Sequence, residues 1–185
     1  MKLINDNKPD CIVAVFDSKE KNFRHDIYPE YKANREAEPD DLISQIPYIL
    51  KITQALNIDI LQKTGYEADD IIATLARKYA SSDLEVYIVS GDKDLAQLIN
   101  DNIKMYTVAT PPLIMGREEI KEKYGIYPEQ VIDWLALMGD SSDNIPGVPC
   151  IGAKTAVKLI SQLGTLEQIY ERLDEVNPPR IQNIL

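Results

Sequence analysis

Aspartate and glutamate residues recur along the chain in four short groups, each at a place where a strand or helix is expected to begin or end. The groups are Asp17; Glu67, Asp69 and Asp70; Asp92 and Asp94; and Asp140 and Asp143. Carboxylates gathered in one pocket repel one another unless cations hold them, and hard ions such as Mg²⁺ or Mn²⁺ prefer oxygen ligands. Such a cage, with two ions about 4 Å apart, is suited to hydrolysis of phosphodiesters.

Each acidic group also has an ordinary structural interpretation. Carboxylates in the first turn of a helix are favoured by the helix dipole, which accounts for Asp69 and Asp70. Gly-Asp and Asp-Asn pairs, such as those at Asp140 and Asp143, are common turn residues. For one group alone the two interpretations are about equally good, but four groups at the ends of elements favour a metal site.

The elements that would position these carboxylates alternate between strands and helices. Strands are expected at 11–16, 58–62 and 85–89, and helices at 41–56 and 66–79. The first strand, a β-branched apolar run typical of a buried parallel strand, leads into Asp17, and the third leads into Asp92. This order predicts an α/β fold with a mostly parallel sheet flanked by helices, whose ligands bind beyond the carboxyl ends of the strands.

After Pro111 and Pro112 the pattern becomes helical, with no strand signal from Arg117 onward. Helices are expected at 117–123, 128–138, 152–163 and 165–173, where Trp134 falls on a core-facing stripe. The sequence therefore predicts one domain made of an α/β core, residues 1–116, and a small helical subdomain, residues 117–185.

The charge of the chain does not by itself identify a partner. A formal net charge of −10 over 185 residues argues against nucleic acid, but the basic residues are unevenly distributed. Five lie within 19–35, and residues 144–166 contain Lys154 and Lys158 without any acid. No apolar run is long enough to span a membrane, and no secretory signal opens the chain. Cys11, expected to be buried, and Cys150 are expected to be free thiols in the cytoplasm.

Six motifs occur in an order and spacing that resemble the 5′–3′ exonuclease domain of bacterial DNA polymerase I, a relative of phage 5′ nucleases and flap endonucleases. They are Phe16-Asp17, Phe23-Arg-His25, Tyr31-Lys-Ala-Asn-Arg35, Gly65-Tyr-Glu-Ala-Asp-Asp70, Asp92-Lys-Asp-Leu95 and Gly139-Asp-Ser-Ser-Asp-Asn-Ile-Pro-Gly147. The resemblance implies a metal-dependent 5′–3′ exonuclease or 5′-flap endonuclease that acts in DNA replication and repair. The DNA would carry a 5′ end, flap or nick.

The resemblance also assigns roles to individual residues. One Mg²⁺ or Mn²⁺ position would be lined by Asp17, Glu67, Asp69 and Asp70, and the other by Asp92, Asp94, Asp140 and Asp143. Tyr31, Lys32 and Arg35 match the base of a helical arch that passes the single strand. There Lys32 and Arg35 would contact the scissile phosphate as catalytic residues, with Arg24 as a further DNA contact. A solvated basic turn is the structural alternative for this segment.

Residues 144–156 resemble the helix-hairpin-helix-type element that grips duplex DNA in this family. Gly147, Gly152, Lys154 and Lys158 would contact phosphates at the start of a helix. A potassium ion would be held by the carbonyls of Leu137, Met138, Pro146, Val148 and Ile151. Cys150 stands where the family usually has glycine, so a positive φ there would be strained and would weaken the grip on DNA.

The front of the chain departs from the family pattern. The family begins with a further strand and a ligating aspartate, whereas residues 1–4 resemble the end of the helix that follows. The chain is therefore expected to be a fragment, with a DNA polymerase domain as a candidate partner. Two alternatives stay open: a catalytically impaired, structure-specific DNA-binding fragment, and a related metal-dependent ribonuclease.

Overall fold

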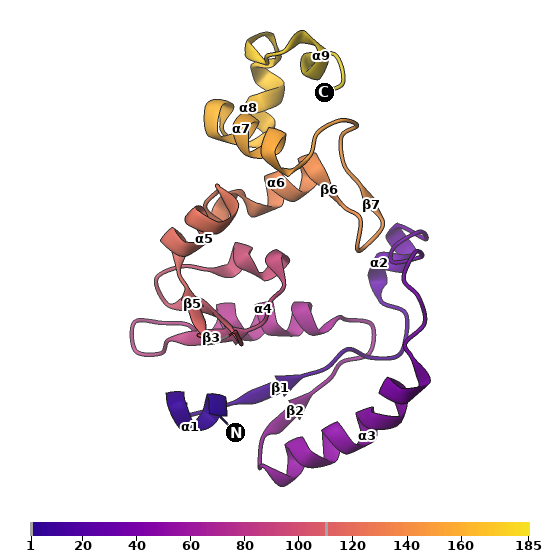
Figure 1. The fold of residues 1–185 in the computed structure, drawn as a ribbon, viewed down its shortest axis with the longest axis vertical. Helices are drawn as coiled ribbons and strands as arrows, with labels where there is room; N and C mark the ends of the chain where they lie inside the picture. The colour runs from indigo at the N-terminus through magenta and orange to yellow at the C-terminus, as the bar shows by residue number, and fades with distance from the viewer. Residues whose placement is uncertain (1, 110) are drawn as a thin grey trace. The chain divides into compact units, whose positions relative to one another are not determined.

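The computed structural model describes residues 2–109 and 111–185 (Figure 1). Contacts between Cα atoms divide the chain into two units. Unit 1 comprises Met1–Pro29 and Arg35–Ile72, and unit 2 comprises Glu30–Asn34 and Ala73–Leu185. This division differs from the boundary at residue 116 that the sequence predicts. The segment 30–34 belongs to unit 2 because its contacts are with residues far from it in sequence.

Unit 1 is built from short elements. It contains α1 (Lys2–Asn7), β1 (Val13–Val15), α2 (Phe23–Ile27), α3 (Asp40–Ala55), β2 (Asp59–Leu61) and the start of α4 (Ala68–Tyr79). β1 and β2 pair in parallel, with Val13 opposite Asp59 and Val15 opposite Leu61. The expected strands and helices are therefore present.

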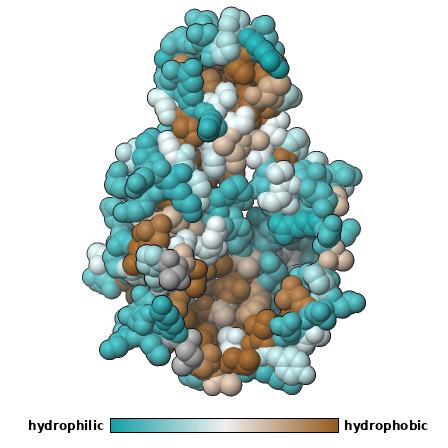
Figure 2. Space-filling view, in the orientation of Figure 1, coloured by the Kyte–Doolittle hydropathy of each residue, from teal (hydrophilic) through white to brown (hydrophobic). Residues whose placement is uncertain are grey.

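The side chains of unit 1 are more exposed than its apolar sequence predicts. β1 was expected to be a buried strand, but Val13 is 37% exposed, and Cys11 is exposed as well. Ile52 on α3 is 60% exposed. Figure 2 shows hydrophobic residues open to view at the level where Figure 1 draws β1, β2 and α3. The expectation of buried side chains here was wrong, because this strand pair has few partners of its own to pack against.

Unit 2 contains a three-stranded sheet in the order β3–β4–β5. β3 (Val86–Val89) and β4 (Ile103–Thr107) pair in parallel, connected through the 3₁₀ helix η1 (Lys93–Leu98), and β5 (Leu113–Met115) is antiparallel to β4. β4 and β5 were not anticipated from the sequence, although Ile103 and Met105 alternate inward around Lys104. The parallel pairs β1–β2 and β3–β4, with helices between them, confirm the α/β class.

The rest of unit 2 is mainly helical, as predicted. In chain order its elements are α5 (Arg117–Tyr124), η2 (Pro128–Gln130), α6 (Val131–Met138), α7 (Ala153–Leu163), α8 (Leu166–Glu171), η3 (Leu173–Glu175) and α9 (Pro179–Gln182). Trp134 is 5% exposed, which confirms its packing role, and Leu137 and Ile160 are buried beside it on α6 and α7. This core supports the loops that carry Asp92, Asp94, Asp140 and Asp143.

A small hairpin after α6 corrects the expectation that no strands follow Arg117. β6 (Gly139–Asp140) pairs antiparallel with β7 (Ile145–Pro146). Gly139 adopts φ +73°, and a Cβ on Gly147 would lie 2.2 Å from the carbonyl carbon of Met138. Two glycines therefore let the backbones approach closely. Strands of two residues that contain Gly and Pro carry no alternating pattern, so local sequence could not reveal them.

Candidate metal-binding and DNA-contact site

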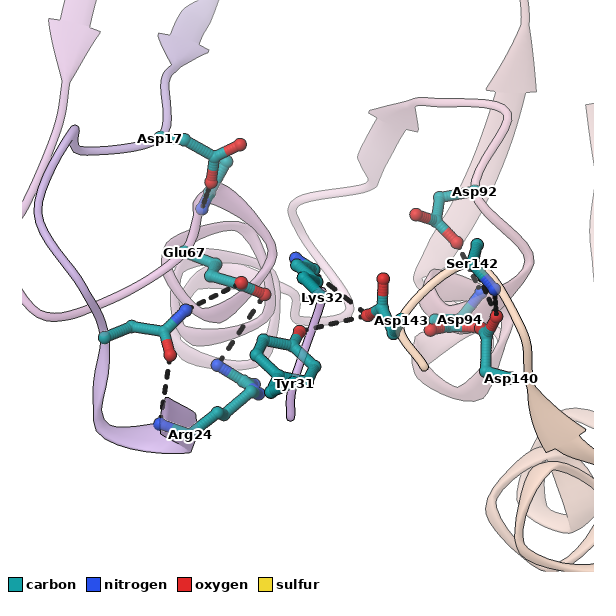
Figure 3. Close-up of polar contacts among 12 residues, drawn as sticks. Asp17, Arg24, Tyr31, Lys32, Glu67, Asp92, Asp94, Asp140, Ser142 and Asp143 are labelled. Carbon is teal, nitrogen blue, oxygen red and sulfur yellow. Dashed lines mark hydrogen bonds and ion pairs between the residues drawn. The ribbon is translucent and has the colours of Figure 1, made fainter. Parts of the chain in front are cut away.

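The four carboxylates of unit 1 surround the start of α4. Asp17 follows β1, and its Oδ1 accepts a hydrogen bond of 2.7 Å from the backbone N–H of Ala68, which opens the helix. Glu67 Oε1 accepts a 2.7 Å hydrogen bond from Asn22 Nδ2, and the Asn22 side chain is buried. Asp69 and Asp70 occupy the first turn of α4, where the helix dipole favours negative charge. Figure 3 shows Asp17 and Glu67 at this end of the helix.

Arg24 neutralises part of this group. Its guanidinium donates two hydrogen bonds to Asp70, of 2.8 and 2.7 Å, and lies 3.8 Å from Glu67 Oε2. Such a bidentate pair is among the stronger charge-assisted contacts in proteins. Arg24 was predicted to contact DNA, and here it pairs with two predicted metal ligands. The DNA contact of Arg24 stays a prediction, as does the metal site itself.

The carboxylates of unit 2 lie at the ends of β3 and β6. Asp92 caps η1, because its Oδ1 accepts a 2.9 Å hydrogen bond from the backbone N–H of Asp94. Asp140 Oδ1 accepts from both the backbone N–H and the hydroxyl of Ser142. Asp92, Asp94 and Asp140 gather in Figure 3, each held by its own turn or helix start. The strand ends thus position these side chains as the sequence predicts.

A lysine between two of these aspartates was not singled out from the sequence. Lys93 Nζ lies 2.6 Å from Asp140 Oδ2 and 3.2 Å from Asp94 Oδ1. Burial disfavours the ammonium, but hydrogen bonds to Asp140 and Asp94 outweigh burial and raise the pKa of Lys93. Burial likewise opposes the charge of Asp140, and the hydrogen bonds from Lys93 and Ser142 together lower the pKa of Asp140 to about 2. Asp140 is therefore ionised at neutral pH.

Asp94 has the opposite balance. Burial is the main reason that its pKa is raised, with further contributions from the charges of Asp92 and Asp140. Its Oδ1 is buried and contacts the Lys93 ammonium at 3.2 Å, and this attraction opposes the rise in pKa. A buried carboxylate oxygen of this kind is costly unless a cation satisfies it. The donor set is entirely oxygen and fits a hard divalent ion. Within residues 2–109 and 111–185, however, no three acidic, histidine or cysteine side chains already converge on one ion position.

The segment 30–34 and the loop 141–144 are joined by hydrogen bonds that each segment donates to the other. Tyr31 is buried, and its hydroxyl donates to Asp143 Oδ2 at 3.0 Å. The backbone N–H of Lys32 donates to the carbonyl of Asp143 at 3.0 Å, and Lys32 Nζ lies 3.9 Å from Asp143 Oδ2. Asn34 donates to the carbonyl of Ser141, and Asn144 donates back to that of Glu30, both at 2.7 Å. A predicted phosphate contact and a predicted metal ligand are therefore held together. Arg35 begins the second stretch of unit 1.

The predicted duplex-gripping hairpin contains the strained residue that the sequence suggested. Cys150 adopts φ +64°, and Arg180 Nη2 donates to its Sγ at 3.2 Å. Gly152 caps α7, and Lys154 and Lys158 on that helix line a hollow of about 370 Å³ together with Asn177 and Pro178. These two lysines therefore face a common recess rather than packing into the core.

The five carbonyls proposed for potassium lie around the same hairpin. The carbonyl of Leu137 accepts a 2.9 Å hydrogen bond from the N–H of Val148, and that of Val148 accepts one of 3.0 Å from Ile151. Pro146 lies opposite Gly139 in the β6–β7 pair, and Met138 ends α6. A carbonyl oxygen has a second lone pair, so these bonds leave ligation open.

Sequence reasoning missed the polar residues that hold the carboxylates and their loops. Asn22 and Lys93 contact carboxylates directly, and Asn34 and Asn144 join segments 30–34 and 141–144 through backbone carbonyls up to 114 positions away in the chain. Only Lys93 had a local signal, since it stands between two predicted metal ligands.

Comparison with known families agrees with this geometry. Residues 1–125 match the 5′-3′ exonuclease N-terminal resolvase-like domain, and residues 126–185 match the 5′-3′ exonuclease C-terminal SAM fold. The chain belongs to the 5′-3′ exonuclease family. Within the described part of this family member, no helix combines the length and apolar character needed to cross a membrane.

Relatives of this 5′-3′ exonuclease family member include both separate exonucleases and longer polymerases. It is 48% identical to the 5′-3′ exonuclease of Buchnera aphidicola subsp. Schizaphis graminum, over 93% of this chain and 60% of that protein. It is 43% identical to DNA polymerase I of Bacillus subtilis, over 100% of this chain and 21% of that protein. The chain thus spans less than two thirds of the length of the first of these relatives and about a fifth of the second.

Solved structures share the fold. The T5 5′-exonuclease with bound zinc is 26% identical, with a TM-score of 0.81, over 99% of this chain and 72% of that one. The catalytic core of Rad2 in complex with DNA substrate is 17% identical, with a TM-score of 0.59, over 94% of this chain and 57% of that one. At that identity the Rad2 likeness concerns the fold alone.

Proposed function

We propose that the chain is a metal-dependent 5′-3′ exonuclease or 5′-flap endonuclease that hydrolyses DNA phosphodiesters near a 5′ end in replication and repair. The observation that carries the proposal is the set of carboxylates at strand and helix ends, including the buried Asp94 Oδ1, in a chain of the 5′-3′ exonuclease family. The reaction would occur in the cytoplasm, beside a DNA polymerase.

Two groups of carboxylates would hold divalent ions. One position is assigned to Asp17, Glu67, Asp69 and Asp70, and the other to Asp92, Asp94, Asp140 and Asp143. When bound, Mg²⁺ or Mn²⁺ would supply an activated water and neutralise charge on the leaving oxygen. The protein positions the donors through its own contacts: Asn22 orients Glu67, Ser142 orients Asp140, and Tyr31 orients Asp143.

Lys32 and Arg35 are proposed to contact the scissile phosphate. Lys32 adopts φ +56° and has its backbone N–H fixed to the carbonyl of Asp143. Because this bond places the lysine beside a proposed metal ligand, its ammonium can stabilise the charge that grows on the phosphate. Tyr31 supports the segment from within the core, and Arg24 is proposed to exchange its carboxylate partners for DNA.

The hairpin and α7 are proposed to grip the duplex beyond the cleavage point. Gly147 lets the backbone of β6 and β7 approach closely, Gly152 opens α7, and Lys154 and Lys158 supply charge at the recess. A potassium ion held by the carbonyls of Leu137, Met138, Pro146, Val148 and Ile151 would rigidify the turn. Neutralising both lysines should reduce the salt slope of duplex binding by about one to two units. An unchanged slope would remove α7 from the DNA interface.

The decisive test is cleavage of a labelled 5′-flap DNA by the purified chain, with Mg²⁺ and with EDTA, at DNA occupancy fixed by a binding assay. We expect a product that requires Mg²⁺ and much slower cleavage of the matching RNA flap. Equal cleavage of RNA and DNA flaps would favour the ribonuclease alternative. Tight binding with no cleavage in Mg²⁺ or Mn²⁺ would show a DNA-binding protein without nuclease activity.

A further inference from the structure

The ammonium of Lys93 lies among carboxylates that are proposed to bind metal in unit 2. Nζ is 2.6 Å from Asp140 and 3.2 Å from Asp94, and the three side chains are exposed by only 29%, 11% and 33%. At these distances in a partly buried site, charge attraction is much stronger than between solvated side chains. The contact is therefore more than an ordinary surface ion pair.

Lys93 and a divalent ion would neutralise the same two carboxylates, Asp94 and Asp140. A positive charge must neutralise Asp94 and Asp140, because Asp92 adds a third negative charge nearby. Lys93 provides that charge from within the chain, but its single ammonium lies closer to Asp140 Oδ2, at 2.6 Å, than to Asp94 Oδ1, at 3.2 Å. The ammonium thus stabilises the group without fully satisfying it, and an ion that bound all the oxygens would be better suited.

A hollow next to Asp140 can accommodate the Lys93 side chain once it leaves the carboxylates. A hollow of about 440 Å³ beside Asp140 is lined by Lys93, Ser141, Ser142, Gly152 and Ala153 among others. An ammonium released from the carboxylates can enter this space and stay hydrated. Its flexible four-carbon stem allows that change without any movement of the backbone.

We propose that Lys93 is a built-in counter-ion, which holds Asp94 and Asp140 together in the metal-free protein and is displaced when a divalent ion binds. This inference rests on the proposed metal site of unit 2. It assigns Lys93 a positioning role: the lysine preserves the geometry of the carboxylates between turnovers and lowers their affinity for the ion.

The first test uses the unmodified protein and follows the reactivity of its lysines. Acetylation at limiting reagent, mapped by mass spectrometry, should label Lys93 several times faster in saturating Mg²⁺ than in EDTA, because the ion frees its ammonium. Lys104 is the internal control, since it is 30% exposed and pairs with Glu85 at 2.8 Å, and its rate should not change. Equal labelling of Lys93 in the two conditions would overturn the proposal.

The second test measures Mn²⁺ affinity by electron paramagnetic resonance for the parent, Lys93→Met, Lys93→Arg and Lys104→Met. Removing a neighbouring positive charge should tighten binding roughly tenfold in Lys93→Met. Lys93→Arg and Lys104→Met should stay near the parent. Lys93→Met should also melt at a lower temperature in EDTA and regain stability with Mn²⁺.

The outcomes separate this inference from the proposed function. If the parent binds no Mn²⁺, the metal site itself is wrong. If the parent binds Mn²⁺ while Lys93→Met binds it equally or more weakly, the metal site stands and Lys93 is a structural ion pair only. Should Lys93→Met fail to fold, the labelling of the unmodified protein decides alone.

Discussion

The two units hold their carboxylates in different ways. Among the described residues, the buried apolar side chains lie in unit 2, including Leu137, Ile103 and Ile160, whereas the buried residue of unit 1 is the polar Asn22. Asp92 and Asp140 therefore extend from elements fixed by a packed core. Glu67 and Asp70 are fixed instead by polar partners, Asn22 and Arg24. Local stability depends on apolar packing, so unit 1 is expected to open more readily.

The largest effect should come from the same substitution made in each unit. Ile103 is 1% exposed and Ile52 is 60% exposed. Ile103→Ala should lower the free energy of unfolding by about 2–5 kcal/mol, because it leaves a cavity. Ile52→Ala should change it by less than about 0.5 kcal/mol. Urea denaturation followed by circular dichroism measures both, and equal losses would contradict the contrast between the units.

A smaller loss is expected from a methyl group added where two backbones meet in unit 2. In Gly147→Ala the new Cβ would clash with the carbonyl of Met138, and relief of that clash should cost about 1–3 kcal/mol. Gly91→Ala is the matched control, since nothing lies within 4 Å of its Cβ position and Gly91 caps no helix. Thermal melts compare the two variants. Identical melting temperatures would mean that the β6–β7 pairing is not as close as described.

Cys150 offers a change in the opposite direction. An L-residue at φ +64° bears a steric penalty of about 1 kcal/mol that glycine avoids. Cys150→Gly should therefore stabilise the chain by up to about 1 kcal/mol, less whatever the Arg180 contact contributes. It should also tighten duplex binding. Cys11→Gly serves as a control without a positive φ, and a melting temperature that rises for both variants would refute the explanation.

Another effect concerns the acid stability of unit 2 in EDTA. The pKa of Asp140 falls from 3.8 to about 2 on folding, so its contribution is present above pH 3.8 and disappears as the pH drops toward 2. Carbon-13 NMR of the Asp140 carboxyl should report this value. Lys93→Met should raise the pKa, whereas Lys104→Met should not. An unchanged Asp140 pKa in Lys93→Met would show that the ion pair does not form.

Local patterns predicted the elements well and the polar connections poorly. The β-branched run before Asp17 and the helical periodicity of 66–79 correspond to β1 and α4. The pairing of Asn34 with Ser141 and of Asn144 with Glu30 joins segments more than 100 residues apart, which no local pattern records. The burial of Cys11 was wrong for a related reason, because burial depends on the neighbours that a strand finds.

Asp92 caps η1 as well as being a proposed metal ligand, so the choice of substitution matters. Asp92→Ala would remove both a charge and the cap of η1, and a lost cap costs about 1 kcal/mol. Asn is as good a cap as Asp, so Asp92→Asn removes the charge alone. Asp101→Asn, at an exposed aspartate of the same unit, controls for the loss of one negative charge.

The rate of Mg²⁺-dependent cleavage of a 5′-flap DNA by Asp92→Asn, at matched DNA occupancy, tests the central claim most directly. Mutation of a residue that only hydrogen-bonds to a metal ligand typically lowers metal affinity or activity by about 10–100-fold. Loss of a ligand itself should therefore lower the cleavage rate by roughly a hundredfold or more. The melting temperature in EDTA should stay unchanged or rise, because repulsion among carboxylates is relieved. Asp101→Asn should cleave at the parent rate. Parent-like cleavage by Asp92→Asn would contradict the assignment of the unit 2 carboxylates to a catalytic metal site.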